Sequence, residues 1–437
     1  MTNTELFTLF RNMTIFLATI MLIKYFIFLV LASYFPYRVK RRELKLLKQE
    51  FKQHGAISPY KPKVSVIIPA WNEEIGVLKT VRSVLKNDYV LSEIIIVNDG
   101  STDQTKERVN TFIDEYNKYL ASTEARRPAH PIRIYSVPNG GKGKALNHGI
   151  REARGEIILT IDADSVLAPN AITNLVKYFR DKRVSAVVGQ VRIGNTNGRI
   201  IGRMQQLEYL FGFYFKRAHC VLGAEYIYGG ACAAFRKNAT FDYFGHFDEV
   251  NKTEDIEMSM RTKFHGLKSC YAEDVICYTE GASNYFGLIN QRLRWKKGRF
   301  ETFLVYRRMF FSFDRHHNKP LSWFILPYAL FSELQLLLEP IGATLLITYS
   351  IISGEYISLA LSMLFVGISY FIVSLFNTNM SLRQRIGLIF LWPITWPLFY
   401  LLVWIEFQAL VRSFHMVMRD DKLEWQRWQR EGINTTP

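Results

Sequence analysis

Two short stretches in the second half of the chain combine side chains suited to group transfer. Thr253–Glu254–Asp255 places two carboxylates side by side, and Gln291–Arg292–Leu293–Arg294–Trp295 supplies an amide, a fixed cation and a flat aromatic face. A carboxylate can take a proton from a sugar hydroxyl, an arginine can hold phosphate, and a tryptophan can stack on a sugar ring. A Thr-Glu-Asp triplet alone is equally typical of a helix start with an acidic first turn. The functional interpretation therefore depends on the acidic motifs upstream.

Acidic and amide side chains follow three predicted strands in the first half of the chain. Buried strands are predicted at 64–69, 93–97, 132–137 and 156–161, and helices alternate with them at 75–85, 103–119 and 144–152. This alternation predicts an α/β fold in which helices cover a mostly parallel sheet. Ligands of such sheets bind at the carboxyl ends of the strands, where this chain carries Asn72–Glu73, Asp99 and Asp162–Ala163–Asp164.

The pair Asp162 and Asp164 is suited to a divalent cation. Alternate side chains of an extended segment share a face, so both carboxylates can point at one ion and a diphosphate. Mg²⁺ and Mn²⁺ prefer oxygen ligands, and substrate phosphates commonly complete their coordination. A solvated turn is the alternative for an isolated Asp-x-Asp, but the other acidic strand ends favour the metal site.

Two glycine-containing segments could bring the backbone close to a ligand. Asn139–Gly140–Gly141–Lys142–Gly143–Lys144 opens a predicted helix, where backbone N–H groups and a lysine favour phosphate. This segment matches neither a P-loop nor a dinucleotide fingerprint. Gly229–Gly230 begins a run of small residues that would let the backbone approach a sugar, and tight packing explains the run equally well.

Composition and charge favour a membrane protein over a nucleic-acid-binding protein. The 437 residues are 49% hydrophobic and 14% aromatic, and the net charge is +16. Basic residues gather beside apolar runs, which fits an anionic membrane surface and phosphate-bearing substrates, and no nucleic-acid-binding motif supports the other interpretation. Four cysteines without a Cys-x-x-Cys pair predict free cytosolic thiols rather than zinc or disulfides: Cys220, Cys232, Cys270 and Cys277.

Apolar runs of membrane-spanning length lie towards both ends of the chain. Met13–Phe35 predicts a retained anchor, and the basic cluster at 38–48 places the following region in the cytoplasm. Further along, Trp323–Ile352, Ile357–Phe376 and Ile386–Val411 are each long enough to span, and the last could form a hairpin. We therefore expect a multi-pass protein of the plasma membrane whose catalytic domain is cytoplasmic.

These features divide the chain into consecutive segments. They are an N-terminal segment (1–12), the anchor (13–35), a basic cytoplasmic linker (36–63), the catalytic domain (64–283), amphipathic interface helices (284–320), a membrane bundle of about three spans (321–412) and a polar tail (413–437). Apolar and basic residues interleave from 284 to 313, which is typical of a helix at the membrane surface.

With these motifs the chain resembles the membrane-embedded family 2 glycosyltransferases. These are processive, inverting enzymes such as the bacterial poly-N-acetylglucosamine, cellulose, chitin and hyaluronan synthases. The resemblance extends from about Val64 to Arg308 and implies a GT-A domain, a Rossmann-like fold that binds nucleotide-diphospho-sugars. Thr253–Asp255, Gln291–Trp295 and the chain length look most like the poly-N-acetylglucosamine synthases.

The resemblance also implies how the donor would be held. Lys142 would lie near the diphosphate, and Asp162 and Asp164 would serve the nucleotide and a Mg²⁺ or Mn²⁺ ion. The uridine contacts come from the resemblance alone, and they would be Pro69, Ala70, Asn72, Glu73 and Asp99.

Residues of the two opening stretches would carry the reaction. Asp255 matches the general base of the family, and Glu254 lies beside it. Gln291, Arg294 and Trp295 would hold the diphosphate and the acceptor end. These roles agree with those expected from the residue types.

The leading hypothesis is processive transfer of N-acetylglucosamine from its UDP sugar onto a growing β-linked chain, which the membrane bundle passes out. The alternatives are another family 2 synthase, making hyaluronan, chitin or β-glucan, and single transfer to a lipid acceptor. A catalytically silent subunit that binds sugar nucleotide is a third hypothesis, which the intact acidic motifs oppose. The expected partners are a UDP-sugar donor, the polysaccharide acceptor, membrane lipids and a small accessory membrane subunit, but no nucleic acid.

Overall fold

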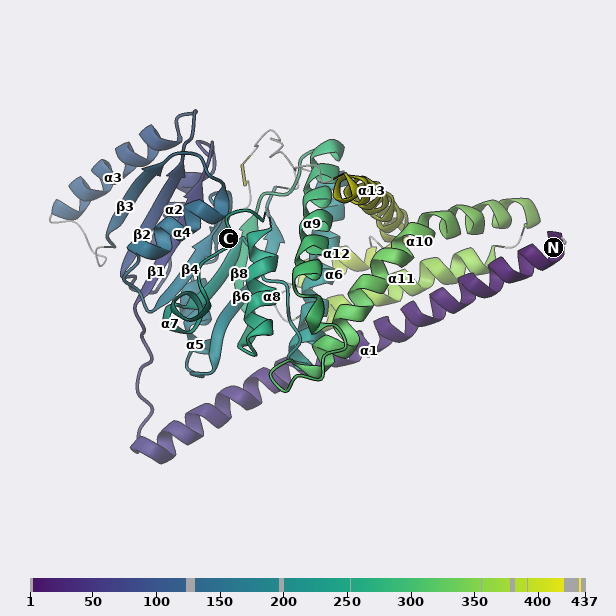
Figure 1. Ribbon diagram of the computed structural model, residues 1–437, viewed down its shortest axis with the longest axis horizontal. Coiled ribbons are helices and arrows are strands. Elements are labelled where there is room, and N and C mark those ends of the chain that lie inside the picture. Colours follow the sequence, from purple (N-terminus) through teal and green to yellow (C-terminus); the bar gives the residue numbers. More distant parts are fainter. Residues whose placement is uncertain are drawn as a thin grey trace.

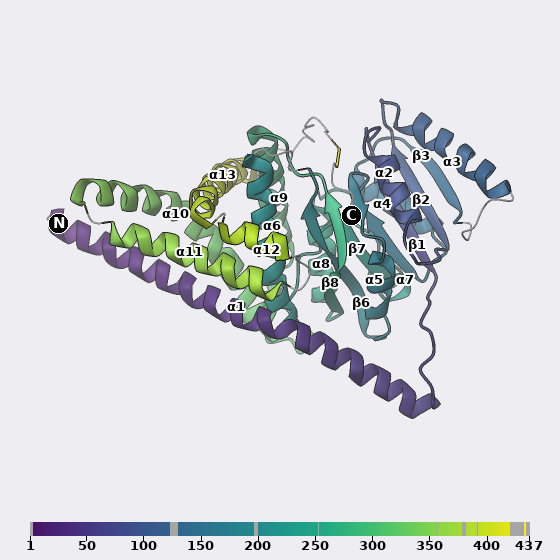
Figure 2. The ribbon, with the colours of Figure 1, turned by 180° about the vertical axis from the view of Figure 1, so that it is seen from behind.

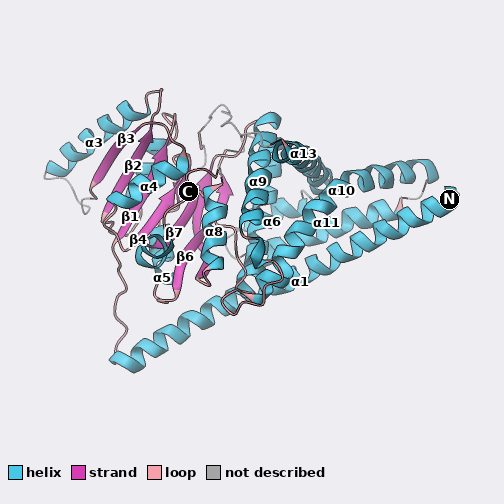
Figure 3. Cartoon of the chain, viewed as in Figure 1, coloured by secondary structure: helices cyan, strands magenta, loops and turns pink. Residues whose placement is uncertain are grey.

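A sheet covered by helices forms one part of the molecule, and long apolar helices form the other (Figures 1 and 3). The computed structural model describes residues 3–122, 130–195, 200–251, 253–354, 356–377, 382–390, 392–419 and 432–433. The N-terminus lies at the far end of the long helices, and the last described residues lie against the sheet part.

One eight-stranded mixed sheet runs through the first part, with the strand order β3-β2-β1-β4-β7-β6-β8-β5. Its strands are β1 (Val64–Ala70), β2 (Glu93–Asp99), β3 (Ile132–Val137), β4 (Ile157–Ile161), β5 (Ser165–Leu167), β6 (Val184–Ile193), β7 (Cys232–Arg236) and β8 (Lys268–Thr279). Strands β3, β2, β1 and β4 are parallel to one another, and β6 is parallel to β8. Strand β7 is antiparallel to β4 and β6, and β5 is antiparallel to β8.

The described helices connect and cover these strands and build the second part. They are α1 (Asn3–His54), α2 (Val77–Leu85), α3 (Thr105–Ala121), α4 (Lys142–Glu152), α5 (Ala171–Tyr178), α6 (Ile200–Val221), α7 (Lys237–Phe244), α8 (Glu254–Phe264), α9 (Tyr285–Val305), α10 (Leu326–Ser353), α11 (Ile357–Phe376), α12 (Leu382–Phe390) and α13 (Trp392–Met418).

The predicted strands are β1 to β4, and all of them are parallel as expected. The sheet as a whole is mixed rather than mostly parallel, because β7 and β5 run against their neighbours. A strand that is buried on both faces has the same apolar pattern whether it is parallel or antiparallel to its neighbours. The pattern of residues 184–236 therefore did not reveal that β7 is antiparallel.

Two apolar cores enclose the sheet. Val66 and Ile68 of β1 pack with residues of α2, α3 and α5, whereas Ile67 packs with residues of α4, α7 and α8. Successive side chains of a strand point to opposite faces, so a strand covered by helices on both faces needs an unbroken apolar sequence. This two-sided burial holds the carboxyl ends of the central strands in fixed positions.

Among the described residues, three helical segments are long and apolar enough to cross a membrane: Leu321–Ile352, Leu359–Phe376 and Ile394–Met418. The first two match the runs predicted there. The third predicted run, 386–411, falls on α12 and α13, and residue 391 between them lies outside the described residues.

Helix α1 continues well beyond the predicted anchor at 13–35, and that anchor stays a prediction. The first part of the predicted linker is helical as far as His54. Arg42 pairs with Asp181 at 2.6 Å, and Glu50 pairs with Arg180, so the basic part of α1 is attached to the sheet domain. In Figures 1 and 2 this helix extends from the long apolar helices along the lower edge of the molecule. Most of the predicted tail at 413–437 lies outside the described residues.

Helices α6 and α9 lie between the sheet and the apolar helices (Figure 2). Helix α9 accounts for most of the predicted amphipathic segment and packs against α13 and α8. The segment is therefore in contact with both parts of the molecule.

Candidate active site

The strand ends that carry the predicted motifs meet at one edge of the sheet. The register pairs Ala70 of β1 with Asn98 of β2, and Ile67 of β1 with Thr160 of β4. The loops after β1, β2 and β4 therefore leave the sheet side by side. Pro69 and Ala70 end β1 directly before its loop.

Asp99 is held by the loop before α4. Its Oδ1 accepts the backbone N–H of Gly140, and its Oδ2 accepts that of Gly141, both at 2.8 Å. The side chain of Asn139 donates to the Asp99 carbonyl oxygen at 3.0 Å. These two amides were expected to favour phosphate, and that expectation is wrong for them because they bind the aspartate. The loop instead fixes the position of Lys142, its next residue.

The loop after β1 is joined to the loop after β2 by hydrogen bonds. Asn72 has a positive φ of 54°, its backbone N–H donates to Ser101 Oγ at 2.9 Å, and its side-chain oxygen accepts the N–H of Thr102 at 2.7 Å. Asparagine tolerates this left-handed conformation better than most residues. The backbone N–H of Glu73 donates to Thr105 Oγ1 at 2.8 Å. Asn72 and Glu73 are thereby fixed beside Asp99.

Lys142 connects the end of β4 to the start of α8. Its Nζ lies 2.6 Å from Asp162 Oδ1 and 3.1 Å from Glu254 Oε1. Burial disfavours the charged ammonium, but Asp162, Glu254 and Asp255 outweigh it, so the pKa of Lys142 is raised. Burial raises the pKa of Asp162, with Lys142 acting against it and Asp164 adding to it. The lysine therefore remains a cation among carboxylates.

Asp255 is fixed by two backbone amides. Its Oδ2 accepts the N–H of Gly230 and its Oδ1 accepts the N–H of Ile256, both at 2.9 Å. Burial and the neighbouring Glu254 raise the pKa of Asp255 to about 6, although Lys142 acts in the opposite direction. A carboxyl group with this pKa is ionised at neutral pH and binds a proton more readily than an ordinary aspartate.

The backbone of Gly230 lies close to two of these charged groups. A Cβ atom at this position would lie 2.7 Å from Lys142 Nζ and 3.1 Å from Asp255 Oδ2. The small residues of this segment were open to two interpretations, approach to a sugar or tight packing. A side chain at position 230 would force the end of Lys142 to shift and Asp255 to move slightly, so the glycine here serves the packing of these two side chains.

We expect Gly230→Ala to reduce glycosyl transfer by roughly 10–100-fold, because small displacements of reacting groups are costly. The added methyl group would displace Lys142 and Asp255. Gly229→Ala is the matched control, since a Cβ there meets only Val191 Cγ2, at 3.8 Å. Rates of UDP release and thermal melting of both variants check the expectation. Equal activity of the two variants, or equal loss, would contradict it.

Asp162 and Asp164 offer oxygen ligands to a divalent cation. Asp164 Oδ1 accepts from Ser165 Oγ at 3.2 Å and from Thr279 Oγ1 at 3.3 Å, and 28% of the Asp162 side chain is exposed. Among the described residues, no group of three or more His, Cys, Asp or Glu side chains could hold an ion by itself. The two carboxylates therefore fit an ion whose other ligands are substrate phosphates and water.

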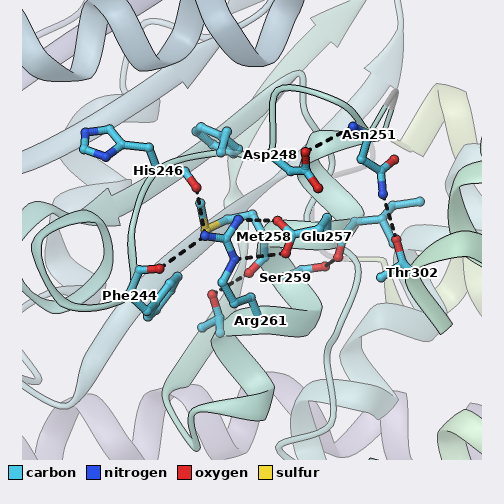
Figure 4. Close-up of polar contacts among 12 residues, drawn as sticks. Phe244, His246, Asp248, Asn251, Glu257, Met258, Ser259, Arg261 and Thr302 are labelled. Carbon is cyan, nitrogen blue, oxygen red and sulfur yellow. Dashed lines mark hydrogen bonds and ion pairs between the residues drawn. The ribbon is translucent and has the colours of Figure 1, made fainter. Parts of the chain in front are cut away.

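Arg261 fixes the loop that leads into α8 (Figure 4). Its guanidinium donates to the carbonyl oxygens of Phe244 at 3.3 Å and His246 at 2.8 Å. It also pairs with Glu257 one turn earlier on the same helix, with Nε 2.9 Å from Oε1. These contacts fix the loop before α8, and so they fix the start of the helix that carries Glu254 and Asp255. The Thr-Glu-Asp stretch is both a helix start and part of the acidic cluster.

Helix α9, which carries Gln291–Trp295, is docked onto the start of α8. Gly298 makes this contact, because a Cβ there would lie 2.0 Å from Thr253 Oγ1. Asn251 strengthens the junction, since its side chain accepts from Thr253 Oγ1 at 2.9 Å. It also donates to Thr302 Oγ1 at 3.3 Å (Figure 4). The Thr253–Asp255 stretch is thus in direct contact with α9 at Gly298, three residues after Trp295.

The side chains of the Gln291–Trp295 stretch differ in their surroundings. Gln291 is only 7% exposed, and no donor in the described part of the chain reaches its Oε1. The positive charge of Arg294 acts to lower the pKa of Asp255, although burial and Glu254 raise it overall. The ring of Trp295 has the guanidinium of Arg292 4.2 Å from its centroid. A buried acceptor without a donor is suited to a ligand hydroxyl or amide.

Sequence reasoning missed residues that act through the backbone or through distant contacts. Gly230 and the pair Gly140 and Gly141 hold the two aspartates, and Arg292 lies against Trp295. These glycines lie in segments where the sequence predicts that the backbone comes close to a ligand, but it did not indicate that the aspartates are what the backbone binds. Arg292 belongs to the stretch Gln291–Trp295, but the sequence indicated no role of its own for it.

Two sequence families match this chain. The pattern described as Glycosyl transferase family 2 matches residues 65–244, and that of Glycosyl transferase family group 2 matches residues 157–407, more than half of the chain. This chain belongs to glycosyltransferase family 2. The resemblance found from the motifs is confirmed, and the protein is a glycosyltransferase.

Relatives and a solved structure agree with this assignment. The poly-beta-1,6-N-acetyl-D-glucosamine synthase of Staphylococcus epidermidis is 30% identical over 84% of this chain and 86% of its own length. The synthase of the same name from Staphylococcus aureus (strain COL) is 32% identical over 59% of both chains. The mannosyltransferase PcManGT from Pyrobaculum calidifontis, solved with GDP-Man and Mn²⁺, has a TM-score of 0.58 at 18% identity and covers 90% of this chain and all of that one. The predicted GT-A fold is thereby confirmed.

Proposed function

We propose that this glycosyltransferase polymerises N-acetylglucosamine from UDP-N-acetylglucosamine into a β-1,6-linked polysaccharide and passes the product through the membrane. The observation that carries the proposal is the Asp255 carboxylate, held by two amides beside Lys142 and Glu254 at the carboxyl edge of the sheet. The names of the staphylococcal relatives support the sugar and the linkage.

Asp255 is the general base in this proposal. An acceptor hydroxyl attacks the anomeric carbon while Asp255 takes its proton, and the bond from that carbon to the diphosphate oxygen breaks. Attack opposite the leaving group inverts the anomeric configuration, and UDP departs with the bonding electrons. Glu254 keeps Lys142 close to the departing diphosphate.

The donor lies along the edge formed by β1, β2 and β4. Pro69, Ala70, Asn72, Glu73 and Asp99 are proposed to surround the uridine, since their loops are joined to one another there. Lys142 and Arg294 both lower the pKa of Asp255 by their positive charge, and cations of this kind are suited to the diphosphate. A Mg²⁺ or Mn²⁺ ion at Asp162 and Asp164 would supply further neutralisation of the phosphate charge when bound.

Gln291 and Trp295 are proposed to hold the acceptor end. The unpaired Oε1 of Gln291 can accept a sugar hydroxyl, and the flat ring of Trp295 can stack on a sugar. The three candidate spans and the basic cluster of α1 support a multi-pass protein with the sheet domain on the cytoplasmic side, where UDP sugars are made.

The transfer rate should fall as the pH is lowered through about 6, because the base must be ionised and burial raises the pKa of Asp255 to about 6. If the base had the usual pKa of an aspartate, the fall in rate would lie about two pH units lower. Initial rates of UDP release between pH 5 and pH 8 check this, with UDP-sugar affinity measured at each pH as a control. A constant rate down to pH 5 with intact affinity would contradict the role of Asp255.

The function itself is tested by supplying purified full-length protein with individual UDP sugars and sizing the products. Long chains should form from UDP-N-acetylglucosamine alone, and a glycosidase specific for β-1,6-linked N-acetylglucosamine should degrade them. If the protein forms a polymer from another UDP sugar, that sugar is its substrate and the proposed one is wrong. A product with one sugar on a lipid would favour the single-transfer alternative.

A further inference from the structure

Six charged side chains, one buried and five partly buried, meet where α9 contacts α6, α10 and α13. The cations are Arg292, Lys296 and Arg299 of α9, and the anions are Glu208 of α6, Glu333 of α10 and Glu406 of α13. Residues 292, 296 and 299 are four and three positions apart, so they share one face of α9. Glu333 and Glu406 belong to candidate membrane spans. This charged cluster is distinct from the carboxylates around Lys142.

Arg292 is the most enclosed cation of the cluster, with 2% of its side chain exposed. Its Nη2 donates a hydrogen bond to Glu208 Oε2 at 2.5 Å, and its Nε lies 3.2 Å from Glu406 Oε1, which is an ion pair without hydrogen-bond geometry. The guanidinium is therefore held between a helix of the interface and a helix of the membrane bundle. Its carbon also lies 4.2 Å from the centre of the Trp295 ring, a cation–π distance.

The remaining pairs attach the next two turns of α9. Lys296 Nζ lies 2.7 Å from Glu333 Oε2 and 2.8 Å from Glu406 Oε2. Arg299 Nη1 lies 2.9 Å from Glu333 Oε1. Glu333 thus contacts Lys296 and Arg299, whereas Glu406 contacts Arg292 and Lys296. The two carboxylates share Lys296, and of the two only Glu406 also pairs with Arg292, the residue that lies on Trp295.

A buried ion pair is weak support for stability, because removing both charges from water is expensive. A carboxylate in a span adds a further insertion cost. Such groups usually serve a specific geometry, and here the geometry they define is the position of Arg292 on Trp295. The cluster has as many cations as anions, so its members neutralise one another in place.

We propose that Glu406 and Glu208 are positioning residues for the acceptor, because they hold Arg292 against Trp295 and so fix the ring on which the acceptor sugar stacks. The membrane helix α13 thereby sets the geometry of the acceptor end through Glu406. This inference rests on the proposed function, since it requires that Trp295 binds the growing saccharide.

The test compares Glu406→Gln with Glu333→Gln, two equivalent charge removals in the same cluster. With a soluble N-acetylglucosamine oligosaccharide as acceptor, Glu406→Gln should raise the acceptor KM by roughly tenfold, as expected for a weakened aromatic contact. UDP-sugar affinity and the maximal rate should stay within about twofold of wild type. Glu333→Gln should leave the acceptor KM close to wild type, since Glu333 does not touch Arg292.

Equal increases in the acceptor KM for Glu406→Gln and Glu333→Gln would overturn the proposal, and so would an unchanged KM in Glu406→Gln. Should Glu406→Gln not fold, Glu208→Gln provides the same test, because Glu208 lies outside the candidate spans and pairs with Arg292. Arg292→Lys keeps the charge but loses the planar group, so the proposal expects a raised acceptor KM there too. A wild-type KM in Arg292→Lys would contradict the proposed geometry.

The proposed function fails separately from this inference. Polymer formation by the wild-type protein tests the function, whereas the acceptor KM of the variants is read from single additions to the oligosaccharide. If the wild-type protein adds one sugar and makes no polymer, the proposed polymerase function is wrong. The acceptor KM of the Glu406 variant can still be measured in that case.

Discussion

Asp255→Asn should lose glycosyl transfer by at least roughly 10²–10⁴-fold while UDP-sugar binding remains, because general-base assistance contributes about that much. The asparagine keeps the shape of the side chain but cannot take a proton from the acceptor hydroxyl. One of the two backbone donors, Gly230 or Ile256, would face an NH₂ group instead of an oxygen, a minor added loss. UDP-sugar affinity and UDP release, measured on the same preparation, check the prediction.

Trp295→Ala is the informative comparison for that variant. It should shorten the products and weaken acceptor binding before it affects the chemical step, because the indole ring is proposed to bind a sugar without exchanging protons. If Asp255→Asn turns over near the wild-type rate, another residue is the general base. Glu254, 3.1 Å from Lys142 Nζ, would be the first candidate.

The sheet and its functional edge were predictable because local patterns define them. Strands β1 to β4 are continuous apolar runs between helices, and their carboxyl ends carry Asn72, Asp99 and Asp162. Parallel strands place these ends on one edge whatever the details of packing. The position of the acidic motifs thus followed from strand direction alone.

The contacts that orient the site could not be predicted, because they join distant parts of the chain. The amides of the loop before α4 bind Asp99, and Arg292 meets Glu406 more than a hundred positions later. A local pattern marks a glycine or an arginine as unusual but does not name its partner. The antiparallel direction of β7 and the length of α1 were hidden for the same reason.

The interpretation of the loop at Asn139–Lys144 shows this limit. Glycines and lysines before a helix fit phosphate binding and fit the support of a neighbouring carboxylate equally well. The structure uses Gly140 and Gly141 for the carboxylate of Asp99 and leaves the lysine beside Asp162. The structure thus brings the segment beside Asp99 and Asp162, and the partner of its two amides is a carboxylate rather than the expected phosphate.

Removal of divalent cations with excess chelator should lower the transfer rate by roughly 10²-fold or more, since an ion at a transferring diphosphate is worth several kcal/mol. Without the ion, Asp162 and Asp164 would face the negative diphosphate, and Lys142 is already paired with Asp162 and Glu254. Added Mg²⁺ or Mn²⁺ should restore the rate.

Asp164→Asn should require more metal for half-maximal rate than the wild-type protein, because it removes one anionic ligand while the hydrogen bonds from Ser165 and Thr279 can persist. Asp88→Asn removes the same charge from an exposed position and is the control. Full activity in excess chelator would exclude the ion from catalysis. In that case Lys142 and Arg294 would have to neutralise the departing UDP without it, and their neutral variants would be the ones to lose transfer.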